Sequence, residues 1–122
     1  MSRDPRKLQA FQLADALVVP VYRATARFPE EERFGLRSQI RRAVISAPTN
    51  IVEGSARRSL SEYVNFLNVS TGSAAELRYL LDVALRLEFL SRKAEAELGQ
   101  ECERLLACLQ ALVRSLDALG RE

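Results

Sequence analysis

The segment SAPTNIVEGSARRS, residues 46–59, decides how this chain can fold. It contains a proline and a glycine, which usually interrupt helices, together with an asparagine, a glutamate and two arginines. On a helical wheel with about 100° per residue, five side chains fall within about 40° of Ile40: Leu36, Val44, Ala47, Ile51 and Gly54. The segment therefore predicts the second half of a helix with a buried stripe, rather than a loop that carries an active site.

Four residues of this segment, Pro48, Asn50, Glu53 and Gly54, are expected to have structural or interface roles. Pro48 removes one backbone hydrogen bond and should bend the helix. Gly54 either lets a neighbouring helix approach closely or helps to end this one. The amide of Asn50 either satisfies backbone groups or bridges to another subunit, and an idle solvent-facing amide is equally compatible with the sequence. Glu53 precedes Arg57 by four residues, which favours an ion pair on a helix.

Apolar residues recur at three- and four-residue intervals in four parts of the chain. The predicted helices span about residues 7–27, 34–57, 59–88 and 91–119. Pro20 should kink the first helix or delay its start, and Ser59 to Glu62 forms a capping-box pattern before the third. No segment alternates at period two, so no sheet is expected. Because the links are short, the prediction is one all-α domain, residues 1–122, folded as an antiparallel up-down-up-down four-helix bundle.

The third predicted helix carries two apolar stripes and a run of six small residues, 70–75. Two stripes favour neighbours on both sides of this helix, one of them from another subunit. A broad core face in a monomer is the alternative. The fourth helix has a single heptad-like seam, formed by Leu98, Cys102, Leu105, Leu109, Leu112, Leu116 and Leu119. Cys102 is therefore expected to be a small buried apolar side chain.

The composition excludes much catalytic chemistry. The 122 residues include no histidine and two cysteines, so Ser-His-Asp and Cys-His nucleophiles, ferritin-like di-iron sites and histidine-dependent RNA-cleaving helical bundles cannot be built. The dense acidic cluster, residues 30–32, follows Pro29 and predicts a negatively charged helix start rather than a magnesium site. We therefore expect no enzyme activity, no cofactor and no metal.

The N-terminal segment lacks the apolar region of a secretory signal, and no apolar run reaches the length of a membrane span. These observations predict a cytoplasmic protein that does not contact a membrane.

Charge is unevenly distributed along the chain. The net charge is only +2, but residues 1–60 carry 11 basic and 6 acidic side chains, whereas residues 61–122 carry 7 and 10. Arginine supplies 16 of the 18 basic side chains, and its planar guanidinium suits phosphate and carboxylate partners. This distribution permits nucleic-acid binding, although the overall pI of about 8.8 is below that of a strongly basic domain.

The run FGLRSQIRRAVISAPTNIVEGSARRS, residues 34–59, resembles the signature of the four-helix bundle family known from 23S rRNA intervening sequences. It is preceded by FPEEERFGL, residues 28–36, which matches the segment that leads into the signature. Third-helix residues also fit the family pattern: Ser59, Glu62, Tyr63, Phe66, Leu67 and the run GSAAEL, residues 72–77. The resemblance extends over about residues 8–119. The chain departs from the pattern at Ala47, where isoleucine is usual, and at Pro20.

The resemblance implies a cytosolic bacterial protein that forms a ring-like homo-oligomer, a homopentamer, and has no enzyme activity. A related protein, the accessory variability determinant of diversity-generating retroelements, is a basic pentamer that binds nucleic acid and a reverse transcriptase. The implied partners of this chain are therefore further copies of itself, RNA or DNA, and a partner protein.

Two functions remain open on the sequence alone. In the first, the protein is an oligomeric nucleic-acid-binding accessory module whose phosphate contacts come from five arginines: Arg37, Arg41, Arg42, Arg57 and Arg58. In the second, it is a structural or protein-interaction scaffold, and the same arginines form salt bridges. The position of Arg41 beside an apolar face and a neutralising partnership of Arg42 with Glu53 would suit the scaffold. A hidden enzyme is the third and least supported option.

Overall fold

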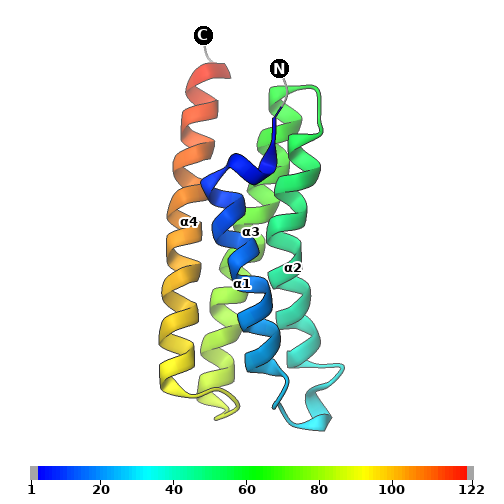
Figure 1. The fold of residues 1–122 in the computed structure, drawn as a ribbon, viewed down its shortest axis with the longest axis vertical. Coiled ribbons are helices and arrows are strands. Elements are labelled where there is room, and N and C mark those ends of the chain that lie inside the picture. The colour runs from blue at the N-terminus through cyan, green and yellow to red at the C-terminus, as the bar shows by residue number, and fades with distance from the viewer. Residues whose placement is uncertain (1–2, 121–122) are drawn as a thin grey trace.

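The computed structural model describes residues 3–120, so the first two and last two residues of the predicted domain lie outside the described part. Four long helices stand side by side along one axis (Figure 1): α1 Gln9–Thr25, α2 Leu36–Ser55, α3 Leu60–Arg86 and α4 Arg92–Gly120. Two single-turn 3-10 helices, η1 Pro5–Lys7 and η2 Glu30–Glu32, precede α1 and α2. Residues 3–120 contain no strand. The all-helical prediction is confirmed, and each predicted boundary lies within two residues of an observed one.

The helices pack as a square, in which α1 and α3 each contact both α2 and α4. Contacts between α2 and α3 run in opposite order along the two helices. Ser46, in the middle of α2, reaches Ser73 in the middle of α3, whereas Gly54, at the end of α2, meets Tyr63 at the beginning of α3. In Figure 1 the chain descends through α1, returns through α2, descends through α3 and returns through α4.

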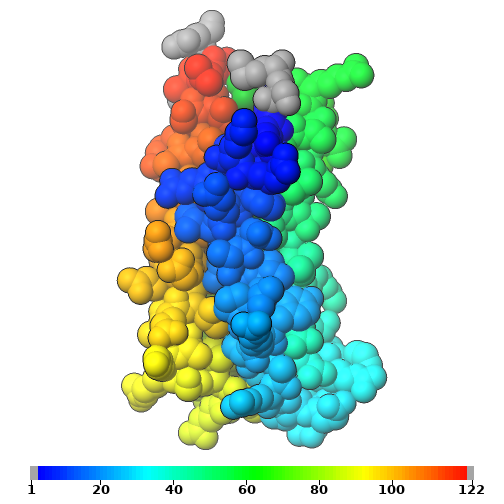
Figure 2. Space-filling model, viewed as in Figure 1, coloured from blue at the N-terminus to red at the C-terminus, as the bar shows by residue number. Residues whose placement is uncertain are grey.

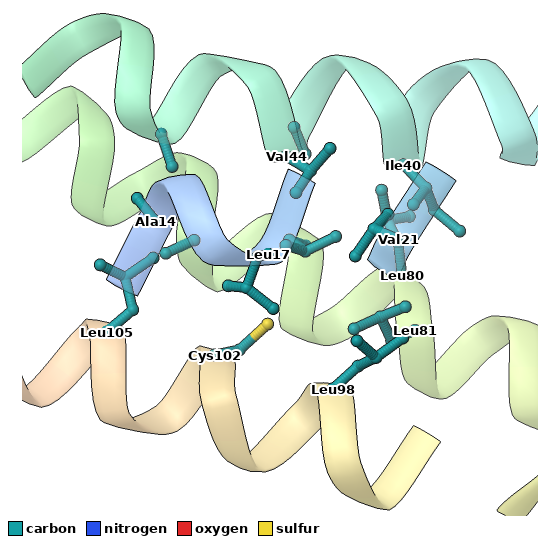
Figure 3. Close-up of a cluster of buried hydrophobic side chains, with 14 of the residues drawn as sticks. Ala14, Leu17, Val21, Ile40, Val44, Leu80, Leu81, Leu98, Cys102 and Leu105 are labelled. Carbon is teal, nitrogen blue, oxygen red and sulfur yellow. The ribbon is translucent and has the colours of Figure 1, made fainter. Parts of the chain in front are cut away.

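The core runs through the middle of the bundle and draws side chains from all four helices (Figure 3). Its largest fully buried side chains are Ile40, Ile51, Leu67, Leu77, Leu81, Leu105, Leu109, Val21, Val44, Thr25, Cys102 and Ser70. The predicted α2 stripe around Ile40 is therefore confirmed as a core face. The α4 seam is buried only in its first part, because Leu119 is 58% exposed.

Helices α2 and α3 approach each other closely through small residues. Gly54 is buried, and a methyl group added to it would lie 2.8 Å from the Cβ of Phe66 and 3.1 Å from Cδ1 of Tyr63. The hydroxyl of Ser70 donates a hydrogen bond of 2.7 Å to the backbone carbonyl of Ala47 inside this interface. Of the alternatives for Gly54, close approach of a neighbouring helix is the one that the structure bears out.

Part of the small-residue run in α3 serves this contact. Ser70, Ser73 and Ala74 are buried, whereas a methyl group on Gly72 would meet no atom within 4 Å. The second apolar stripe of α3 is only partly buried, because Leu80 lies in the core whereas Val69 is 52% exposed. One neighbour of this helix is thus α2 of the same chain.

Local signals explain the helix ends. The hydroxyl of Ser59 accepts a hydrogen bond from the Glu62 backbone amide at 3.1 Å, as in a capping box. The Glu62 carboxylate, however, accepts a hydrogen bond from the Ser59 hydroxyl instead of from the Ser59 backbone amide. Glu32 accepts a hydrogen bond from the Leu36 amide at 2.9 Å, which confirms that part of the acidic cluster serves the start of α2. Pro20 lies inside α1, which continues through it to Thr25.

No helix within residues 3–120 combines the length and the apolar character that crossing a membrane requires.

The Gly54 contact yields a matched pair of predictions. Gly54→Ala should lower the free energy of unfolding by about 1–3 kcal/mol, because the added methyl group overpacks the α2–α3 interface. Gly72→Ala should instead raise it by about 0.5–1 kcal/mol, because it improves helix propensity where no atom lies nearby. Urea unfolding followed by circular dichroism measures both. Equal stability of the two variants would contradict the close packing described here.

Candidate nucleic-acid interface

A shallow groove of about 750 Å³ follows the face of α2 that points away from the core. Its lining comes from α1, the segment before α2, and α2: Tyr22, Arg33, Phe34, Arg37, Ser38, Arg41, Arg42, Ile45, Ser46, Thr49, Asn50 and Glu53. Four of these residues are arginines and one is a carboxylate, so positive charge predominates in the lining of the groove. The segment that leads into α2 (cyan) protrudes at the lower right of the molecule in Figures 1 and 2.

Arg41 holds α1 against α2. Its Nε donates to the Thr25 hydroxyl at 2.9 Å and its Nη2 donates to the Tyr22 carbonyl at 3.0 Å. The guanidinium also lies 4.4 Å from the centroid of the Tyr22 ring. A positive charge at the C-terminal end of α1 interacts favourably with the helix dipole. Arg41, one of the predicted phosphate contacts, therefore has a clear role in the fold.

Arg37 and Arg42 line the same groove but make no comparable contacts with described residues. Within residues 3–120, neither side chain forms an ion pair or a hydrogen bond, and Arg42 is exposed. Arg33, which the sequence analysis did not select, joins them. It pairs with Glu30 at 3.2 Å and its guanidinium lies 4.7 Å from the centroid of the Phe34 ring. The groove thus gathers three of the five predicted arginines and adds a fourth.

Arg57 and Arg58 lie elsewhere, in the link that follows the end of α2. The Arg57 guanidinium lies 4.7 Å from the centroid of the Phe66 ring on α3, and its backbone carbonyl accepts a hydrogen bond from Arg3. The expected Glu53–Arg57 ion pair is absent among the described residues. The prediction was wrong because α2 ends at Ser55, so Arg57 no longer occupies the helical i+4 position.

The proposed Arg42–Glu53 pairing is also absent from the described part of the chain. These residues are eleven positions apart on one helix, which places them about 16 Å apart along the axis. Both line the groove, but at different levels of α2.

The four signature residues divide between the two faces of α2. Pro48 and Gly54 are buried, and Asn50 and Glu53 line the groove. Asn50 donates through Nδ2 to the Ser46 carbonyl at 2.8 Å and to the Ser46 hydroxyl at 3.0 Å. That carbonyl is not the one deprived of its donor by Pro48, which belongs to the residue four positions earlier in the helix. The Asn50 amide therefore binds its own helix, and through Ser46 it supports the contact with α3.

Two aromatic residues of the groove were missed as site candidates. Phe34 is 84% exposed and Tyr22 is 38% exposed. Phe34 appeared in the sequence only as part of the segment leading into the signature. Its position between Arg33 and Arg37 was the available signal, because aromatic side chains interleaved with arginines are typical of nucleic-acid surfaces.

Neither cysteine offers an activated nucleophile. Burial raises the pKa of the Cys102 thiol to about 12, so this thiol stays protonated near neutral pH. Burial also raises the pKa of Cys108. Within residues 3–120, no three His, Cys, Asp or Glu side chains lie close enough together to hold a metal ion.

Comparison with known proteins places the chain in a family. Residues 6–111 match the family model described as 23S rRNA-intervening sequence protein. The chain belongs to this family. The resemblance found in residues 28–77 is thereby confirmed.

A solved structure of a relative supports the fold. A protein of unknown function from the S23 ribosomal protein family of Bacteroides thetaiotaomicron has a similar structure, with a TM-score of 0.77 and 21% sequence identity. The match covers 85% of this chain and 97% of that one. At this identity the likeness concerns the fold alone. No curated protein gave a match to this sequence.

The different environments of two neighbouring arginines can be tested directly. Arg41→Ala should lower the free energy of unfolding by about 1–3 kcal/mol, because it removes two hydrogen bonds and leaves a buried hydroxyl without this partner. Arg42→Ala should change it by less than about 0.5 kcal/mol, because this side chain is exposed. Chemical denaturation of both variants provides the measurement. A stable Arg41→Ala variant would contradict the structural role.

Proposed function

We propose that this protein is a non-enzymatic, homo-oligomeric module that binds RNA or DNA through the arginine groove on α2. The observation that carries the proposal is the concentration of Arg33, Arg37, Arg41 and Arg42 around one groove with Glu53 as its sole carboxylate among the lining residues. Guanidinium groups bind phosphate oxygens as planar, permanently charged forks. Such contacts supply most of the sequence-independent affinity for nucleic acid.

Assembly would multiply this modest charge. Val52 lies on α2 outside the groove and is 44% exposed. Val69 on α3 is also exposed. Apolar side chains of this kind favour a contact with further copies, and the family resemblance suggests five. Repetition of one weak groove in a ring would raise the overall affinity through multivalency. We propose a cytoplasmic location for this assembly.

A structural or protein-interaction scaffold is the second candidate. Two of the five predicted arginines, Arg41 and Arg57, contact aromatic rings of their own chain, and Arg41 also donates to the Tyr22 carbonyl. This use of arginine favours a role in the fold over phosphate binding. The two candidates differ in whether Arg37 and Arg42 bind nucleic acid.

Nucleic-acid binding is tested by a salt titration. The wild-type protein should bind RNA or DNA near 50 mM salt, and its affinity should fall steeply as salt increases. Arg37→Ala combined with Arg42→Ala should weaken binding and reduce the logarithmic salt slope for duplex DNA by about 1.8, because about 0.9 is lost for each phosphate contact. Fluorescence anisotropy measures both quantities.

The matched control removes the same charge from α4, through Lys93→Ala combined with Arg114→Ala. Both side chains are exposed and lie outside the groove. This variant should retain the wild-type affinity and slope. Absence of binding by the wild-type protein at low salt would refute the proposal and leave the scaffold.

The oligomer is tested separately by light scattering. The chain has a mass of 13.7 kDa, and the measured mass should be about five times this value. Val52→Glu should reduce it, because a charge would be buried in the proposed contact. A wild-type mass equal to that of one chain would rule out the assembly.

A further inference from the structure

Phe34 is the most exposed large apolar side chain in the described structure, at 84%, and it lies in the turn that leads into α2. No core contact explains its position. It lines the arginine groove together with Arg33 and Arg37. An exposed aromatic ring in a cationic groove has an apolar face that a phosphate group cannot satisfy.

Arginine and aromatic groups are stacked in pairs along the groove. The Arg33 guanidinium lies 4.7 Å from the Phe34 ring centroid, and the Arg41 guanidinium lies 4.4 Å from the Tyr22 ring centroid. Such pairs hold both flat groups in fixed orientations. Aromatic rings and guanidinium planes are the two protein surfaces on which unpaired bases stack.

The neutral part of the lining also fits unpaired bases. Ser38 and Thr49 bring hydroxyl groups into the groove, and each hydroxyl can donate and accept hydrogen bonds. In a duplex, base faces are stacked on each other and the Watson–Crick edges are occupied. In a single strand, both faces and edges are available to the protein.

We infer that the groove takes single-stranded RNA or DNA in preference to duplex, with Phe34 stacking on one unpaired base while Arg37 and Arg42 contact its flanking phosphates. This inference rests on the proposed nucleic-acid-binding function and specifies the ligand of the same groove. The charge of the groove matches this occupant. A second copy of the chain against Phe34 is the competing occupant, and the experiment separates the two.

The test compares three fluorescent ligands with the full chain near 50 mM salt: a 12-nucleotide oligothymidine, an abasic strand of equal length, and a duplex of 12 base pairs. Oligothymidine should bind most tightly. Phe34→Ala should weaken its binding about 5- to 150-fold, the range found for loss of one base–aromatic stack. Binding of the duplex and the abasic strand should be unchanged, and Phe34→Trp should restore binding of oligothymidine.

Tyr79→Ala is the matched control, because Tyr79 is an aromatic residue of α3 that is 61% exposed and lies outside the groove. It should bind all three ligands like the wild-type protein. Light scattering of Phe34→Ala should give the wild-type mass.

Each contrary result is distinct. Equal binding of all three ligands, with no effect of Phe34→Ala, would overturn the single-strand inference and leave the proposed function intact. A changed mass of Phe34→Ala would assign Phe34 to a contact between copies and overturn the inference. Absence of binding to every ligand would refute the proposed function and the inference with it.

Discussion

The close approach of α2 to α3 is the constraint on which the rest of the structure depends. It requires a residue without a side chain at Gly54, where a methyl group would collide with Phe66 and Tyr63. It also requires small polar residues, because the Ser70 hydroxyl must reach the Ala47 carbonyl between the helices. A buried hydroxyl in such a contact is tolerated only when it is hydrogen-bonded. This contact fixes both the rotation and the height of α2 relative to α3.

One face of α2 packs against α3 and the core. The side chains on the opposite face are therefore the ones available for binding. Arg41 completes the arrangement by joining α2 to the C-terminal end of α1. The same side chain therefore supports the fold and contributes charge to the groove. Arg37, one turn earlier in α2, and Arg42, the next residue along the chain, lack such internal contacts among the described residues, so their guanidinium groups are available to an outside ligand.

Most of the fold could be predicted from the sequence, because the spacing of apolar residues indicates which side chains are buried. The stripe around Ile40 lies in the core, and α3 begins directly after the capping Ser59. Only part of the groove could be predicted from the sequence. Helical angles placed Arg41 correctly beside an apolar face, but they could not show that the end of α1 lies there. The predicted ion pair of Arg57 was wrong because α2 ends two residues before Arg57. A helical wheel does not show where a helix ends.

The unequal lengths of the helices have a consequence for local stability. α4 extends beyond the level at which α1 begins (Figure 1), and none of its described residues after Leu109 is buried. Near its end, Leu116 and Gly120 lie beside Leu60 at the start of α3. Backbone hydrogen bonds in a region with little buried apolar surface open at a lower free energy than those in the core. Amide exchange should therefore be graded along α4, slowest near Cys102 and fastest in the final turns, so that this end unravels without unfolding the arginine groove.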